Sequence, residues 1–395
     1  MNGGTKVRSR LVEFFGLTPE ITAVSASVFL LGCGEHLWRR FLPKYLQSLG
    51  APITAIGLFG TAEDFLDGVY QYPGGWITDR YGRRSALIAL TVLAAAGYVV
   101  YLVLPAWPLA FLGLALVMAW DAMASPTLFA IVGDALPRER RTMGFTVQSV
   151  LKRVPIAVAP ILGGLAVAAY GVRSGVHLGL VVSLVMAAIT IAVVSTIRVP
   201  VIPDETPVTV RHVWRAFPSS LRWLLVSDVF IRTCEGLVDV FLVLYAINVI
   251  GIGAPLFGTL IAIQAVTTII VQIPAARFTQ AAGKKPFVTA TFVAFSLFPL
   301  AVALASGPAW LIVAFVIGGL RELGEPARKA LIVDFAPPSL RGRLVGLYYL
   351  IRSMAIAPAA FVGGLLWKVS PALPFYIACA IGFVGVATFV VTVRE

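Results

Sequence analysis

Long apolar stretches alternate with short polar segments along the whole chain, and this alternation is the dominant pattern in the sequence. About twelve stretches approach the ~20 residues that a helix needs to cross a bilayer. They fall near residues 21–44, 52–76, 86–105, 107–134, 143–169, 176–197, 223–250, 253–276, 287–306, 309–336, 343–368 and 372–392. The pattern predicts an all-α membrane protein with about twelve transmembrane helices. The longest polar segment predicts a cytoplasmic linker at 198–222, between bundles at 1–197 and 223–395.

The two halves repeat each other at a nearly constant offset. At an offset of 200, Pro126, Asp134, Pro137, Arg141, Gly163 and Gly164 match Pro326, Asp334, Pro337, Arg341, Gly363 and Gly364. At an offset of 201, Cys33 matches Cys234 and Gln71 matches Gln272. Such a long internal repeat indicates a duplicated bundle. We therefore expect two pseudo-symmetric bundles of six helices.

Composition argues against a water-soluble enzyme and against a nucleic-acid partner. The 395 residues are 59% hydrophobic and 13% charged, whereas soluble domains carry about 25% charged residues. The net charge of +12 reflects Lys and Arg gathered in alternate loops, with Lys44, Arg173 and Lys368 on the opposite side. The positive-inside rule then places both termini in the cytoplasm. We expect a multi-pass protein of the plasma (inner) membrane.

The polar loop after the second apolar stretch carries a short pattern of glycines and charges. It reads Gly75-x-x-x-Asp79-Arg80-x-Gly82-Arg83-Arg84. With the apolar stretches and the repeat, this pattern resembles the signature of the major facilitator superfamily. The resemblance implies the major facilitator fold, alternating access to a site near the midplane, and a conformational latch in this loop. Arg141 or the start of the eleventh span would be the partner of Asp79.

Two departures from family patterns limit what the resemblance implies. In the second copy of the loop, Ala276, Gln280 and Ala281 replace the Gly, Asp and Arg, so the latch is one-sided. The arginine that proton-driven drug exporters carry on the fourth span is Leu114 here. The sequence therefore does not carry the full signature of a drug–proton antiporter.

Carboxylates on the first two spans are candidates for proton coupling. A charge at the bilayer centre costs a few kcal/mol unless it faces a cavity or a partner. Glu63 and Asp67 lie one helical turn apart with Asp64 beside them, and like charges in a low dielectric favour keeping a proton on one. Counted from the intervening loop, Glu63 lies level with Glu35. We take Glu35, Glu63, Asp64 and Asp67 as the candidates, with Arg39 pairing one of them.

Other intramembrane charges follow helical spacing, and many of them could be structural ion pairs. On the tenth span, Arg321, Glu325 and Lys329 have the i,i+4 spacing of a self-neutralising ladder. On the seventh span, spacing puts Arg232, Glu235 and Asp239 on one helical face. The full set of candidates for a solute cavity is His36, Arg39, Asp121, Lys152, Arg232, Glu235, Asp239, Gln264, Arg321, Glu325, Tyr349 and Arg352.

These features favour a monomeric secondary transporter that exports a small polar, charged or amphipathic solute in exchange for protons. Proton-coupled uptake of a metabolite and a lipid or lysolipid carrier remain alternatives. A divalent metal-ion carrier is a further one, for which Cys33, His36 and Cys234 would be the ligands. No catalytic motif is present, so we expect no enzyme and no cofactor. The expected partners are the solute, a proton or other coupling ion, and membrane lipids.

Overall fold

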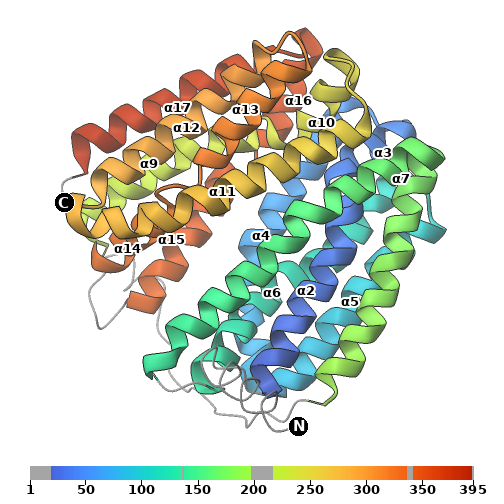
Figure 1. Ribbon diagram of the computed structural model, residues 1–395, viewed down its shortest axis with the longest axis horizontal. Coiled ribbons are helices and arrows are strands. Elements are labelled where there is room, and N and C mark those ends of the chain that lie inside the picture. Colours follow the sequence, from blue (N-terminus) through green and yellow to red (C-terminus); the bar gives the residue numbers. More distant parts are fainter. Residues whose placement is uncertain (1–18, 136–137, 197–216, 336–340, 394–395) are drawn as a thin grey trace, which may run out of the picture. The chain divides into compact units, whose positions relative to one another are not determined.

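The computed structural model describes residues 19–135, 138–196, 217–335 and 341–393 (Figure 1). Within these ranges the regular elements are helices, and no strand is present. Each predicted apolar stretch falls on one helix or on a short series of helices. Contacts divide the chain into a first unit of Met1–Arg40 and Val69–Glu205 and a second unit of Phe41–Gly68 and Thr206–Glu395. Residues 41–68, which the sequence assigns to the N-terminal half, therefore pack within the second unit.

The first unit is built from long helices. They are α2 (Pro19–Trp38), the later part of α4 (Ile53–Tyr81), α5 (Arg83–Val103), α6 (Ala110–Ala135) and α7 (Arg138–Val194), with the short turns η1 (Arg39–Phe41) and η2 (Trp107–Leu109). α2 packs along α7, and α5 packs against α6 and α7. α7 covers the fifth and sixth predicted stretches as two helices that meet at a bend at Gly171, where φ is 82°, a conformation that favours glycine.

The second unit contains the remaining helices. They are α3 (Leu42–Ser48), the early part of α4, α9 (Ser219–Gly236), α10 (Leu242–Leu244), α11 (Ala254–Ala282), α12 (Lys285–Ala303), α13 (Pro308–Leu320), α14 (Glu325–Phe335), α15 (Arg341–Ile356), α16 (Ala359–Val369) and α17 (Leu373–Thr392), with η3 (Asp239–Phe241) and the π-helical η4 (Tyr245–Val249). α17 packs against α9 and α12 (Figure 1). Leu224, Phe292, Tyr348 and Phe389 belong to its buried core.

Local structure repeats with the sequence. α2 and α9 each give way to a short 3-10 turn, at Arg39–Phe41 and at Asp239–Phe241, which are 200 positions apart. A Cβ on Gly163 would overlap the carbonyl oxygen of Leu37, and a Cβ on Gly363 would overlap that of Leu237. The repeated glycines therefore serve the same close helix contact in each half, which explains why both positions need glycine.

The structure divides several predicted spans into more than one helix, and one of these divisions overturns a predicted contact. The stretch at 309–336 is two helices, because α13 ends at Leu320 and α14 begins at Glu325. Gly324 lies in the turn between them, and its N–H donates to Thr291 Oγ1 at 2.5 Å. The intervening turn takes Arg321 out of helical phase with Glu325. The predicted Arg321–Glu325 step of the ladder is therefore wrong.

The helices have the dimensions and surface of membrane spans. In the described ranges, six helices are long and apolar enough to cross a bilayer by length and composition. Large apolar side chains such as Leu162, Val185 and Val313 are about half exposed, at 54%, 50% and 49%. The seventh predicted stretch is too polar to count among these six helices, because α9 carries four charged residues within 18 residues, namely Arg222, Asp228, Arg232 and Glu235. These charges begin the description of the site.

Candidate functional site

In the first unit, one arginine lies between two carboxylates. Glu35 is one turn from the end of α2, Arg39 begins the 3-10 turn, and Asp121 projects from α6. Nη1 of Arg39 donates to both Glu35 Oε1 and Asp121 Oδ2. The side chains are 6%, 29% and 23% exposed for Glu35, Arg39 and Asp121. We call these three residues the first-unit cluster; it holds two carboxyl groups and one permanent cation.

Aromatic side chains lie on one side of the first-unit cluster. Trp38 is buried, donates from Nε1 to Ser183 Oγ at 3.0 Å, and contacts the rings of Tyr98 and Tyr101 on α5. Tyr98 is fully buried, and its hydroxyl has no hydrogen-bond partner within the described residues. These rings exclude water from one side of the cluster, which increases the cost of unbalanced charge.

Two cations lie near the first-unit cluster besides Arg39. Arg40 follows Arg39 in sequence, and Lys152 on α7 acts electrostatically on both His36 and Asp121. Lys152 is exposed and forms no ion pair with any described residue. Among the described residues, Glu35 and Asp121 therefore have one direct ion-pair partner, Arg39, which they share.

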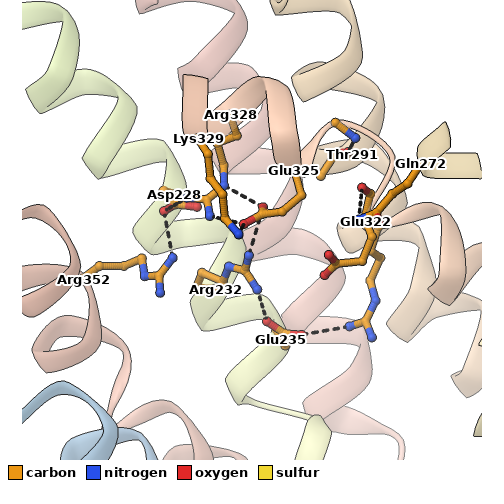
Figure 2. Close-up of polar contacts among 12 residues, drawn as sticks. Asp228, Arg232, Glu235, Gln272, Thr291, Glu322, Glu325, Arg328, Lys329 and Arg352 are labelled. Carbon is orange, nitrogen blue, oxygen red and sulfur yellow. Dashed lines mark hydrogen bonds and ion pairs between the residues drawn. The ribbon is translucent and has the colours of Figure 1, made fainter. Parts of the chain in front are cut away.

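In the second unit, α9 and α14 face each other through a denser network (Figure 2). Asp228, Arg232 and Glu235 occupy one face of α9 at i, i+4 and i+7. Arg328 Nη1 donates to Asp228 Oδ2 at 2.6 Å, and its Nε and Nη2 donate to Glu325 at 2.8 and 2.6 Å. Both Arg328 and Asp228 side chains are nearly fully buried. This pair is the centre of the network.

Three further arginines extend the network outward. Arg232 bridges Glu235 at 2.8 Å and Glu325 at 3.3 Å. Arg321 donates to Glu235 at 3.3 Å and from Nε to its neighbouring Gly318 carbonyl at 3.0 Å. Arg352 on α15 reaches Asp228 Oδ2 at 3.5 Å. We call Asp228, Arg232, Glu235, Arg321, Glu325, Arg328 and Arg352 the second-unit cluster.

The two clusters occupy matched positions with opposite charge patterns. Glu35 and Glu235 are 200 positions apart, as are Asp121 and Arg321. In the first unit an arginine is shared by two carboxylates, whereas in the second unit Glu235 is shared by Arg232 and Arg321. Duplication therefore retained the places of the charges and inverted their balance.

The acidic residues at the start of α4 lie in the second unit. Asp64 Oδ2 is 3.7 Å from where a Cβ on Gly236 would stand, so it lies beside the end of α9. The groups that act electrostatically on it are Glu63, Glu235, Asp239 and Asp67, all carboxylates. No hydrogen bond or ion pair joins Asp64 to the part of the chain that the structure describes. The prediction that Glu63 lies level with Glu35 spans the two units and stays a prediction.

Several predicted residues have different surroundings from those expected. Asp239 does not continue the helical face of Arg232 and Glu235, because α9 ends at Gly236. Lys329 is 62% exposed and lies 3.7 Å from Glu325, so this step of the predicted ladder is present. Gln264 packs against Gly318, and the ring of Tyr349 lies under Arg352, 4.6 Å from its guanidinium carbon.

Asp228, Arg328 and Tyr348 were not among the candidate site residues predicted from the sequence. Asp228 and Arg328 form the most buried ion pair, and the Tyr348 hydroxyl donates to Asp228 Oδ2 at 3.1 Å. The signal for Asp228 is its i,i+4 and i,i+7 spacing to Arg232 and Glu235 on α9. Arg328 has a local signal in its i,i+3 spacing to Glu325, but the pairing of Arg328 and Tyr348 with Asp228 has none, since 100 and 120 residues separate them.

Much of the predicted latch lies outside the described side chains, namely Gly75, Asp79, Arg80, Arg83 and Arg141. Gly82 has φ 80° between α4 and α5, and Arg84 is exposed. Of the candidate metal ligands, Cys33 is half-buried in the first unit, and Cys234 is buried in the second with its thiol directed to the Phe295 carbonyl at 3.4 Å. The described ranges contain no group of three metal-binding side chains.

Helices that are long and apolar enough to cross a bilayer indicate a multi-pass membrane protein. The chain belongs to the Major Facilitator Superfamily, whose family model matches residues 24–234 and 224–395. It is 21% identical over 367 residues to an uncharacterized MFS-type transporter of Methanocaldococcus jannaschii, covering 89% of this chain and 91% of that protein. It is 28% identical over 155 residues to a Na(+), Li(+), K(+)/H(+) antiporter of Planococcus maritimus, covering 38% and 36%.

The fold agrees with solved transporters. A POT family transporter in complex with 5-aminolevulinic acid aligns with a TM-score of 0.76 at 16% identity, covering 94% of each chain. These comparisons confirm the predicted family and fold class. The protein is thus an integral membrane secondary transporter.

Proposed function

We propose that the protein exports a small polar, charged or amphipathic solute by alternating access, in exchange for protons bound at the first-unit cluster. The partial similarity to a cation/proton antiporter supports exchange rather than co-transport. The division into bundles at 1–197 and 223–395 and the cytoplasmic placement of both termini are parts of this proposal.

The sharing of one guanidinium nitrogen by Glu35 and Asp121 carries the proposal. If both carboxyl groups are ionised, the cluster has a net charge of −1 in a site where Glu35 is 6% and Asp121 is 23% exposed, which is costly. One proton neutralises the cluster, because the remaining carboxylate keeps its ion pair with Arg39. The two carboxyl groups also lie within hydrogen-bonding reach of each other, so they can share that proton.

Proton binding then changes the charge of the cluster between −1 and 0. A neutral cluster tolerates apolar surroundings, whereas an anionic cluster favours water or a cation. The protonated and the ionised cluster therefore favour conformations that expose the cluster to solvent to different degrees. Coupling requires such a difference in free energy between conformations. Asp64 is a second proton-binding candidate, since its charged neighbours are carboxylates.

Proton movement in proteoliposomes tests the proposal. The vesicles enclose a pH-sensitive dye, and Na+, K+, amino acids and organic acids are added in turn. We expect at least one addition to drive proton movement in the wild-type protein, and Glu35→Gln and Asp121→Asn to reduce it to the level of protein-free vesicles. Asp334→Asn, which changes an exposed carboxylate on α14, is the control. Persistence of the wild-type signal in both cluster variants would refute the role of this cluster.

A further inference from the structure

The second-unit cluster contains more guanidinium groups than carboxylates. It joins four arginines to three carboxylates through the hydrogen bonds and ion pairs described above. Asp228 and Glu325 already pair with the buried Arg328 at 2.6 Å, and Glu235 accepts from Arg232 and Arg321. Every carboxylate therefore has two or more donors, while donor groups of the arginines remain unused.

Arg352 is the arginine with the weakest pairing. Its one contact to a carboxylate is at 3.5 Å, to an Asp228 oxygen that already accepts from Arg328 and Tyr348. Its Nε is buried without a hydrogen-bond partner in the described part of the chain, and the same holds for Nε of Arg232. A guanidinium offers five N–H donors, and a buried donor without an acceptor is unfavourable by about 1–3 kcal/mol. Asp228 Oδ1 is also buried without a donor, so within the described residues the cluster leaves both of these Nε groups and one carboxylate oxygen unpaired.

Aromatic rings contact the guanidinium groups of these arginines. The guanidinium carbon of Arg352 lies 4.6 Å from the Tyr349 ring centre, and that of Arg232 lies 4.9 Å from Phe295. Arg321 lies 4.4 Å from Phe298 and 5.1 Å from Phe295. Rings that hold the guanidinium groups in this way leave N–H donors available for carboxylates and phosphates, which bind arginine through two parallel bonds.

The repeat provides a second observation. The residue matched to Arg352 in the first half is Lys152, which is also a cation. Lys152 is exposed and has no ion-pair partner among the residues described. A cation at an intramembrane position without a full partner is a sign of function in a spanning helix.

We propose that Arg352, with Arg232 and Arg321, binds an anionic group of the transported solute, a carboxylate or a phosphate. The proposal rests on the function proposed above, because it names the chemical class of that solute. The anion supplies the acceptors that Nε of Arg352 and Arg232 lack, and it balances the excess positive charge of the second-unit cluster. A neutral acceptor such as an amide carbonyl would satisfy only the first requirement, and a cationic group would satisfy neither.

Thermal unfolding of the purified full-length protein tests the proposal without a proton gradient. The probes are inorganic phosphate and succinate, compared with neutral succinamide and cationic putrescine at equal ionic strength set by NaCl. We expect phosphate or succinate to raise the unfolding midpoint in a saturable way, and succinamide and putrescine to leave it unchanged. No anion-specific rise in the wild-type protein would overturn the proposal.

Variants then locate the site. Arg352→Gln should weaken the apparent affinity for the active anion at least tenfold, as expected for the loss of a charge-assisted hydrogen-bond pair. Arg352→Lys keeps the charge and should restore only part of the affinity. Lys329→Gln removes an exposed cation from the same helix as Arg328 and should change affinity less than threefold. Equal affinity in Arg352→Gln and the wild-type protein, or an equal loss in Lys329→Gln, would contradict the proposal. Failure of proton coupling would not alter these binding results, so the two proposals fail separately.

Discussion

Replacing Arg328 with leucine is expected to reduce the free energy of unfolding by about 3–5 kcal/mol, the usual effect of removing one partner from a buried ion pair. Arg328 is 1% exposed and makes three hydrogen bonds, to Asp228 and Glu325. Its loss leaves Asp228, which is fully buried, with Tyr348 at 3.1 Å and Arg352 at 3.5 Å as its remaining donors among the described residues. Reversible unfolding of the purified protein by denaturant measures the change.

Two variants control this prediction. Lys329→Leu changes the neighbouring exposed cation on α14 and should alter the unfolding free energy by less than about 1 kcal/mol. Combining Arg328→Leu with Asp228→Leu removes both charges of the buried pair, and it should recover part of the loss. A loss below 1 kcal/mol in Arg328→Leu would mean that the pair is not the centre of the second-unit cluster.

Replacing Arg39 with glutamine is expected to abolish proton-coupled movement while the fold persists. Without the guanidinium, Glu35 and Asp121 can each stay neutral by binding a proton and can hydrogen-bond to each other. We expect a stability loss of about 1–3 kcal/mol, the effect of lost hydrogen bonds to a buried group. Because both protons remain bound, proton movement in proteoliposomes should fall to that of protein-free vesicles.

The double variant Arg39→Gln with Asp121→Asn separates folding from coupling. The second substitution removes the Asp121 carboxyl group, one of the two that Arg39→Gln leaves without a cation. The free energy of unfolding should therefore return toward the wild-type value. Glu35 then has no cation to favour its ionised form, and coupling should stay lost. Recovery of proton movement in this double variant would show that Arg39 does not control the proton affinity of Glu35.

The sequence predicted the spans and the repeat well, because both depend on local patterns. Apolar length indicates a helix wherever it occurs, and the repeated Gly163 and Gly363 have the same backbone contact in both halves. The Glu35–Arg39 pair was also accessible, since i,i+4 spacing brings the two side chains together on a helix.

The partners of the charges were less predictable. Arg39 pairs with Asp121 across 82 residues, and Arg321 pairs with Glu235 across 86. Helical spacing gave wrong neighbours where a helix ends, as for Arg321 at the turn before α14 and for Asp239 after Gly236. Such breaks depend on packing, here of Gly324 against Thr291, although Gly236, Gly324 and Pro326 mark them in the sequence.

The central claim is that Glu35 and Asp121 hold one proton between them, and infrared absorption of protonated carboxyl groups at neutral pH measures this without a solute. We predict that Glu35→Gln and Asp121→Asn each remove one protonated carboxyl from the wild-type band, since the remaining carboxylate pairs with Arg39. Arg39→Gln should add one. Glu235→Gln should leave the band unchanged, because Glu235 is paired with two arginines. An identical band in the wild-type protein, Glu35→Gln and Asp121→Asn would contradict the account.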